Sequence, residues 1–354
     1  MKTIILIFTF FVMACSVIAD DYGNKVNFFD GTYEEALLLA AKENKGIMID
    51  FNTEWCIWCR NLEMRVFTNE EFADFVNANL INLKIDAEKG DGIRLAEEFE
   101  ARGFPTTIYL NSEGKELGRV AGYMPPKEFL DYAKQIIVDG LTMEYLKTEV
   151  DKGSNDPKVL YYYAERLYSD GNNEEAIQFY KKVSETDSDY REDAEMMLAI
   201  INEDNQKMKE LVEMYPDNAL TRDIALTFLN ESFESKDDAE IQSVIKNIEA
   251  IYPDDEFVKF YIGQYYLGKA SKVMRDSNAT NEERLSVMEF TNKAEPYLQG
   301  MIFVAGVDYV RSELEYQMGN FEKANEYINK SLSLWSYRKL YKEQKNKIVK
   351  ALGE

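Results

Sequence analysis

The spacing of apolar residues changes once along the chain, near Gly140. Before it, short apolar runs that predict strands alternate with segments whose apolar residues recur every three or four positions, which predict helices. Strands are expected at 46–51, at 80–86, after Pro105 up to Leu110, and at 116–120. Helices are expected at 33–40, after Cys59, at 69–77, at 93–99 and from 125 onwards. Alternating strands and helices that end in a hairpin predict an α/β sandwich around a mixed sheet.

After Gly140 the pattern predicts helices and no strand. A helix–turn–helix pattern surrounds Gly171 and returns around Gly319, and about four tetratricopeptide-like periods separate the two glycines. Both segments resemble that repeat, in which small residues let paired helices approach each other. Pro216 and Pro253 are expected to end further helices. We therefore predict an all-α solenoid of tetratricopeptide-like helix pairs over 141–354, following an α/β domain over 20–140.

The first nineteen residues are typical of a signal peptide, because Lys2 precedes an apolar core that is too short to span a bilayer. Cleavage after Ala19 would release a chain that begins at Asp20. An alternative reading is a lipobox that makes Cys15 a lipidated N-terminus. We favour release, and either reading predicts an exported protein, periplasmic if the source is bacterial.

Composition excludes several classes of function. The net charge of −23 leaves no basic surface for nucleic acid, and it suits anionic membranes equally poorly. The chain has no histidine, which removes Ser-His, Cys-His and His-metal mechanisms. Two thiolates without further soft or imidazole ligands do not complete a zinc site, so we expect no metal and no other cofactor.

Cys56 and Cys59 lie between a predicted strand and a predicted helix, which places both sulfurs on the first helical turn. Unpaired backbone N–H groups and the helix dipole favour a thiolate there. We predict that Cys56 is an exposed nucleophile and that Cys59 resolves the mixed disulfide. The alternative is a structural bridge, but a loop this short adds little stability.

Asp50 ends the central apolar strand, where a carboxylate is costly to bury. Burial would raise its pKa and suit it to accept the proton of Cys59. The alternative is a strand-end carboxylate bound to backbone N–H groups.

Residues 26–138 resemble the thioredoxin-fold family, most closely its exported members. The resemblance rests on motifs in the family's order and spacing: Asp50-Phe51, Glu54-Trp55-Cys56-x-x-Cys59, Lys84-Ile85-Asp86, Gly103-Phe104-Pro105-Thr106, Gly122 and a Val66-Phe67-Thr68-Asn69-x-x-Phe72 segment. It implies a thioredoxin fold and electron transfer by cysteine exchange, without a flavin or nicotinamide. It also implies the proton-accepting role of Asp50.

The resemblance assigns further residues to substrate binding. It implies that Pro105 is a cis-proline beside the cysteines that offers its backbone to the substrate, that Phe104 flanks the sulfurs, and that Trp55 packs over the site. The alternative for Pro105 is a trans-proline that opens an edge strand. In one departure, the family's lysine partner of the buried Asp falls on Asn82, with Lys84 two residues further on.

Ile57 and Trp58 occupy the variable dipeptide between the cysteines. A charged imidazole there would stabilise the thiolate and make the disulfide strongly oxidising, whereas an apolar pair does not. We therefore predict a reducing or weakly oxidising pair. The alternative for Trp58 is simple surface packing.

Together these features predict an exported thiol–disulfide oxidoreductase, acting as a reductant on protein thiols and disulfides. A membrane electron donor would recharge it, and the helical repeats would recruit a protein partner. The alternative is a non-enzymatic scaffold that works through those repeats. An isomerase would need dimerisation or a second thiol domain.

Overall fold

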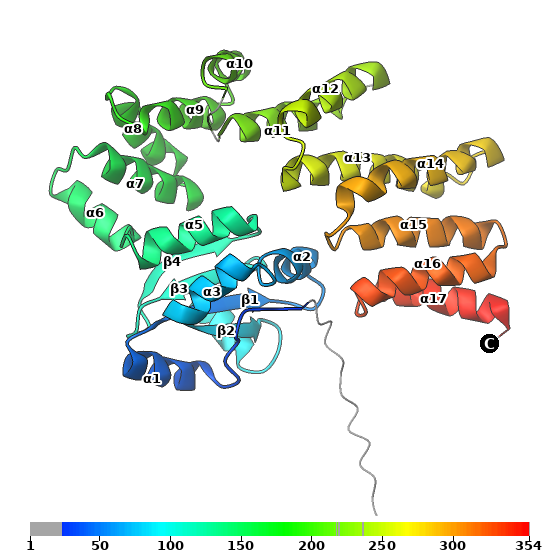
Figure 1. Cartoon of the computed structure of the whole chain (residues 1–354), viewed down its shortest axis with the longest axis horizontal. Coiled ribbons are helices and arrows are strands. Elements are labelled where there is room, and N and C mark those ends of the chain that lie inside the picture. The colour runs from blue at the N-terminus through cyan, green and yellow to red at the C-terminus, as the bar shows by residue number, and fades with distance from the viewer. Residues whose placement is uncertain (1–22, 217, 219, 236, 354) are drawn as a thin grey trace, which may run out of the picture.

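The computed structural model describes residues 23–216, 218, 220–235 and 237–353 (Figure 1). The predicted signal peptide, its cleavage site and Cys15 lie outside the described residues.

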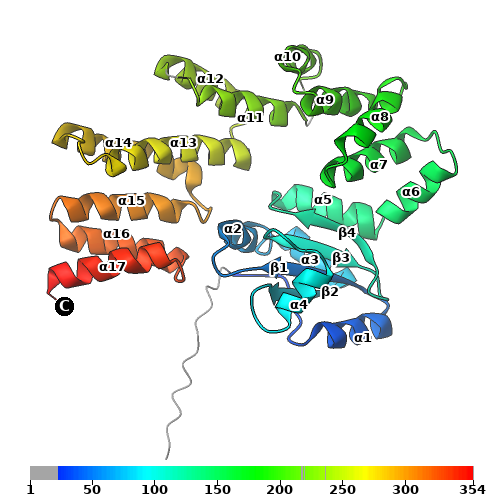
Figure 2. The ribbon, with the colours of Figure 1, turned by 180° about the vertical axis from the view of Figure 1, so that it is seen from behind.

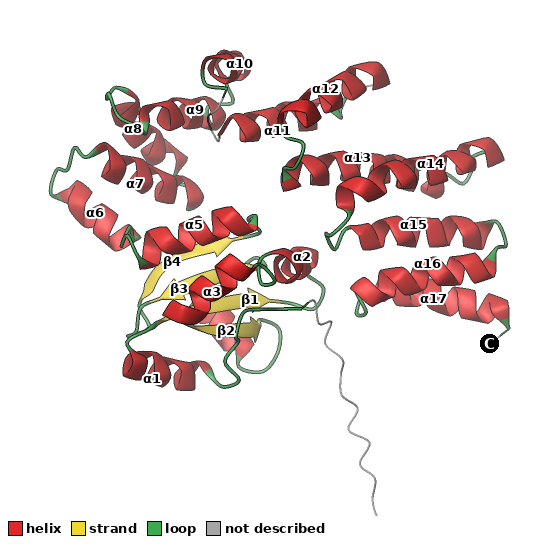
Figure 3. Cartoon of the chain, in the orientation of Figure 1, coloured by secondary structure: helices red, strands yellow, loops and turns green. Residues whose placement is uncertain are grey.

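A four-stranded mixed sheet forms the centre of the N-terminal half (Figure 3). Its strands are β1 (Gly46–Asn52), β2 (Leu80–Asp86), β3 (Thr106–Leu110) and β4 (Glu116–Ala121), in the order β2-β1-β3-β4. β1 is parallel to β2 and antiparallel to β3, and β3 and β4 form the expected hairpin. The predicted mixed sheet is confirmed.

Helices cover both faces of this sheet. They are α1 (Tyr33–Glu43), α2 (Ile57–Arg65), α3 (Glu70–Asn79), α4 (Gly92–Glu98) and α5 (Pro126–Ile137). Because side chains alternate along a strand, Ile47, Ile49 and Phe51 of β1 pack in the core that α1 and α4 cover. Met48 packs in the opposite core, with α2, α3 and α5. Asp50 shares the Met48 face, so the alternation directs its carboxyl group towards the α2 side.

The start of α1 follows its local sequence. The Thr32 hydroxyl accepts the Glu35 N–H at 3.2 Å, and the Glu35 carboxylate accepts the Thr32 N–H at 2.9 Å. This capping box satisfies two N–H groups that have no partner within the helix. The sequence carries the signature of this box, with Thr32 before the helix and Glu35 three residues later.

The described residues after Leu141 contain helices and no strand. The helices are α6 (Met143–Asp151), α7 (Pro157–Ser169), α8 (Asn173–Ser184), α9 (Arg191–Ile201), α10 (Asn205–Met214), α11 (Leu220–Ser232), α12 (Asp238–Ile251), α13 (Glu256–Arg275), α14 (Asn281–Leu298), α15 (Val304–Gln317), α16 (Phe321–Leu334) and α17 (Lys339–Leu352). Successive helices pack against each other, as in an all-α solenoid.

The turns between these helices use the residues expected from the sequence. Gly171 separates α7 from α8 with φ +79°, and Gly319 separates α15 from α16 with φ +81°. A side chain is strained at such angles, which is why glycine suits both turns. Pro216 follows the end of α10, and Pro253 follows the end of α12. The tetratricopeptide assignment and the boundaries at 20–140 and 141–354 stay predictions.

The helical region curves away from the sheet at α5 and α6 and then returns to it (Figures 1 and 2). Its second half brings α13 and α15 close to α2, the helix that carries the cysteine pair. The described residues include no helix with the length and apolarity to span a membrane.

Candidate active site

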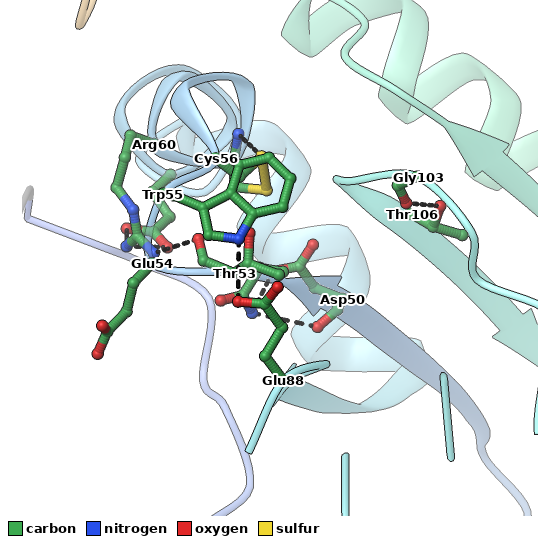
Figure 4. Close-up of a disulfide and its surroundings, with 12 residues drawn as sticks. Asp50, Thr53, Glu54, Trp55, Cys56, Arg60, Glu88, Gly103 and Thr106 are labelled. Atoms are coloured by element: carbon green, nitrogen blue, oxygen red, sulfur yellow. Dashed lines mark hydrogen bonds and ion pairs between the residues drawn. A yellow bond between two sulfur atoms is a disulfide. The ribbon is translucent and has the colours of Figure 1, made fainter. Parts of the chain in front are cut away.

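Cys56 and Cys59 form a disulfide at the N-terminus of α2 (Figure 4). Cys56 is the N-cap residue of the helix, and its sulfur accepts the backbone N–H of Cys59 at 3.0 Å. The first turn of α2 contains no acidic residue, so no like charge opposes a thiolate there. Once the bond is reduced, this N–H group and the helix dipole favour the Cys56 thiolate.

Both sulfurs are covered, with Cys56 only 3% exposed and Cys59 1% exposed. Our expectation of an exposed Cys56 is therefore wrong for the disulfide form. Ile57 and Trp58, which follow Cys56 directly, pack against the large core of the helical region. The helical region thus packs against the first turn of α2.

Asp50 lies on β1 with its side chain buried at 1% exposure (Figure 4). Burial is the largest cause that raises its pKa from 3.8 to about 7, and the charge of Glu63 raises it further. Lys84, its register partner on β2, opposes the rise, as does the Asn52 amide, which donates to its Oδ2 at 3.3 Å. Its Oδ1 has no hydrogen-bond partner among the described residues. A carboxyl group that titrates near neutrality suits proton transfer.

A cluster of acidic and basic side chains, of which Lys84 is exposed, extends from Asp50 towards α2. Glu63, itself only 4% exposed, accepts two hydrogen bonds from Arg60 at 2.8 Å and pairs with Lys84 at 2.5 Å. The cation opposite Asp50 is therefore Lys84, whose ammonium group also binds Glu63. Sequence reasoning missed Arg60 and Glu63. Their i, i+3 spacing on the helix that follows the cysteines was the available signal.

The loop before β3 forms the other side of the site. The Phe104–Pro105 peptide bond is cis, and Pro105 is buried. Phe104 makes an edge contact with Trp55, with ring centroids 6.2 Å apart. Trp55 remains 58% exposed and donates its indole N–H to Glu88 at 2.9 Å. An exposed ring beside the cysteine is available to a substrate, so the binding roles of Trp55, Phe104 and Pro105 stay our prediction.

Trp58 joins the two halves of the chain. Its ring stacks on Tyr123 at 5.5 Å and contacts Phe260 of α13 at 4.9 Å and Phe303 at 4.7 Å. The variable dipeptide is thus part of an interface within the chain. Its proposed influence on the redox potential stays a prediction.

Polar contacts reinforce this interface. Glu256, the first residue of α13, forms an ion pair with Arg65 of α2 and accepts the Tyr123 hydroxyl at 2.9 Å. The Trp335 indole N–H reaches the Glu54 carbonyl at 3.4 Å. None of these contacts was expected from the sequence, since their partners lie about 130 to 280 positions apart.

We expect Trp58→Ala to loosen the helical region from α2. Each aromatic contact contributes about 0.5–1.5 kcal/mol, so the loss of the contacts with Phe260 and Phe303 should raise the equilibrium constant for opening roughly tenfold. Alkylation of reduced Cys56 should accelerate by a similar factor, measured by mass spectrometry with a bulky maleimide. Phe179→Ala, which breaks a pair with Tyr163 between α7 and α8, is the matched control. An unchanged rate in Trp58→Ala would show that this contact does not govern access.

The site offers no metal centre within the part of the chain that the structure describes. No group of three or more Cys, Asp or Glu side chains is placed there to hold an ion. The chemistry available to the cysteine pair is the exchange of sulfur–sulfur bonds.

Comparison with known proteins supports this interpretation. A sequence model described as a thioredoxin-like domain matches residues 33–137. Over 109 residues the chain is 29% identical to the thiol:disulfide interchange protein DsbD of Pseudoalteromonas atlantica, a match that covers 30% of this chain and 18% of that protein. Over 104 residues it is 26% identical to the disulfide bond reductase DsbH of Chlamydia pneumoniae, covering 27% of this chain and 62% of that protein.

A solved structure of a putative disulphide-isomerase from Bacteroides thetaiotaomicron is 33% identical, with a TM-score of 0.30, and the match covers 32% of this chain and 93% of that one. The chain spans about a fifth of the curated DsbD proteins and less than two thirds of DsbH. The sheet order and the matched segment confirm the predicted thioredoxin fold for the N-terminal half.

Proposed function

We propose that this chain, whose residues 33–137 form a thioredoxin-like domain, is a thiol–disulfide oxidoreductase that acts on disulfides in proteins. The observation that carries the proposal is the Cys56–Cys59 pair at the N-terminus of α2, where the Cys56 sulfur receives a helix N–H. The names of the DsbD and DsbH relatives, which describe interchange and reduction of disulfides, support it.

The reaction balances without a bound cofactor. The Cys56 thiolate attacks one sulfur of a substrate disulfide, forming a mixed disulfide and releasing the other sulfur as a thiolate, which takes a proton from water. Cys59 then loses its proton and attacks the Cys56 sulfur, releasing the second substrate thiolate, which is also protonated. The substrate gains two electrons and two protons, and the Cys56–Cys59 pair is oxidised to the disulfide.

Asp50 is our proton acceptor for the second step. Its pKa of about 7 lets it take the Cys59 proton at neutral pH and return it to water afterwards. Glu63 assists by keeping that pKa high, because its negative charge disfavours a second one nearby.

We propose that the pair works as a reductant. The dipeptide Ile57-Trp58 contributes no charge that would stabilise the Cys56 thiolate, and a less stabilised thiolate favours the disulfide form. A reductant of this kind needs an electron source, for which we propose a membrane-bound dithiol donor. We also propose that the chain is exported through residues 1–19 and that the helical region recruits the protein partner.

A redox titration in glutathione buffers tests the proposal. The protein, carrying Cys15→Ser so that only the pair is counted, is equilibrated with reduced and oxidised glutathione, and Cys56 and Cys59 are alkylated and counted by mass. We expect a single two-electron transition at a potential more negative than that of the glutathione couple, which is about −240 mV. A more positive potential would contradict the reductant role, and a pair that never titrates would contradict disulfide exchange altogether.

A further inference from the structure

A pocket of about 420 Å³ lies between Ile57, the first residue of α2, and the helical region. Its walls come from α13, α15, the segment between α16 and α17 and the first residues of α17, and Ile57 closes it from the start of α2. Ile57 follows Cys56 directly, so the pocket wall includes the sequence neighbour of the nucleophile.

The floor of the pocket is aromatic. Trp335, only 1% exposed, makes an edge contact with Tyr341 at 6.2 Å, and Tyr341 stacks on Tyr309 at 5.2 Å. The Trp335 indole also reaches the Glu54 carbonyl, which connects this floor to the chain just before Cys56. Such a surface suits an apolar or aromatic side chain, since rings pack favourably at these distances.

The rim of the pocket carries positive charge in a chain whose net charge is −23. Arg275 ends α13 and Arg338 precedes α17, with its guanidinium 4.8 Å from the Trp335 ring centre. Both arginine side chains are exposed. Glu313 is the carboxylate among the lining residues, and it accepts the Tyr309 hydroxyl at 2.5 Å. The rim therefore suits a ligand with a carboxylate.

The two sequence neighbours of Cys56 contact different features of the site. On one side Trp55 contacts Phe104, and on the other Ile57 lines the pocket. A polypeptide substrate is long enough to contact both the cis-proline loop and the pocket, whereas a small disulfide is not.

We propose that the pocket is a specificity subsite for the substrate polypeptide. It takes an apolar or aromatic side chain close to the exchanging cysteine, and Arg275 and Arg338 bind an adjacent carboxylate. This inference rests on the proposed disulfide exchange. It identifies the substrate class as segments in which an aromatic and an acidic residue accompany the cysteine.

Peptide competition in single turnovers tests the subsite. Reduced protein reacts with short peptides that contain one cysteine, joined to mercaptoethanol by a disulfide. One neighbour of the cysteine is Phe or Ala and the other is Glu or Lys, which gives the four peptides Phe-Glu, Ala-Glu, Phe-Lys and Ala-Lys. Each rate is divided by the rate with hydroxyethyl disulfide, which is neutral and reports the reactivity of the cysteines alone. We expect Phe-Glu to exceed Ala-Lys by roughly 50-fold, about tenfold from the ring and about fivefold from the charge.

Variants of the pocket residues show which side chains produce the preference for aromatic and acidic peptides. Arg275→Glu with Arg338→Glu changes two exposed side chains, so the fold is retained, and it should reverse the choice between Glu and Lys peptides. Ser271→Phe, which fills the pocket, should remove the preference for Phe. Lys272→Gln, an exposed cation on α13 outside the pocket lining, is the matched control and should keep both preferences.

The outcomes separate the two proposals. No reaction with hydroxyethyl disulfide would overturn the proposed function itself. Reaction with hydroxyethyl disulfide but equal normalised rates for all peptides would overturn the subsite alone, as would a preference that the charge-reversed variant retains. A dimer in sedimentation that the charge-reversed variant loses would show that a second copy fills the pocket, and it would also overturn the subsite.

Discussion

Replacing Cys56 by serine is expected to reduce the rate of disulfide exchange by roughly a thousandfold or more. A serine hydroxyl is not ionised near neutral pH and is a poor nucleophile towards sulfur, so the first mixed disulfide does not form. The helix N–H that Cys56 accepts from Cys59 remains available to the serine oxygen, so the fold is retained. Insulin reduction with a chemical reductant as electron source measures the loss.

Cys59→Ser is the matched variant, because it removes the resolving thiol and leaves the nucleophile. It should accumulate mixed disulfides between Cys56 and substrate proteins, visible as reductant-sensitive bands on gels. Both variants carry Cys15→Ser to exclude the third cysteine. An active Cys56→Ser protein would contradict the assignment of the nucleophile, and a Cys59→Ser protein without mixed disulfides would contradict the assignment of the resolving thiol.

Replacing Asp50 by asparagine is expected to stabilise the protein at alkaline pH. The pKa of Asp50 is about 7 in the fold and about 3.9 in an unfolded chain, so the folded protein holds this proton more tightly. Folding stability therefore decreases as pH rises from about 4 to about 7 and is constant above that range. The pKa difference of roughly three corresponds to a loss of at most about 4 kcal/mol in the free energy of unfolding. Asp50→Asn is expected to recover this loss near pH 8 and not near pH 4.

Denaturant unfolding of the disulfide-bonded protein at both pH values measures this difference. Asp74→Asn, which changes an exposed carboxylate on α3, is the control and should alter the free energy of unfolding by less than about 0.5 kcal/mol at either pH. A stabilisation that is equal at both pH values would show that Asp50 is not the titrating group.

The same substitution is expected to slow the reaction by about 10- to 100-fold while it stabilises the fold. In the unsubstituted protein the rate at which Cys59 resolves the mixed disulfide should rise with pH through about 7, as Asp50 loses its proton. Asp50→Asn should lose that inflection. Stopped-flow tryptophan fluorescence across the pH range separates this step from the first attack, and a retained inflection would assign it to another group.

The Cys56 and Asp50 substitutions depend on features that the sequence predicts to different extents. The cysteine pair and the strand before it form one short segment, and the 80–86 strand agrees with β2 from Leu80 to Asp86. The capping box at Thr32 and Glu35 was equally predictable, because its partners lie three residues apart. These features follow from local preferences that short segments carry by themselves.

The environment of Asp50 was only partly predictable. Its position at the end of an apolar strand indicated burial and a raised pKa. The identity of the surrounding charges required the register of β1 and β2, which places Lys84 opposite Asp50, and the packing of α2, which brings Glu63 into the same cluster. Register and packing arise from contacts between segments, and one segment's pattern does not specify them.

The residue pattern alone predicts an α/β half with a Cys-x-x-Cys at a helix N-terminus, followed by a helical half. The return of the helical half to α2, which brings Trp58 against Phe260 and Phe303, became apparent only from the three-dimensional packing. Hydrophobic periodicity shows which face of a segment is buried, whereas the curvature of a stack of helices sums many small packing angles, so no single segment specifies it.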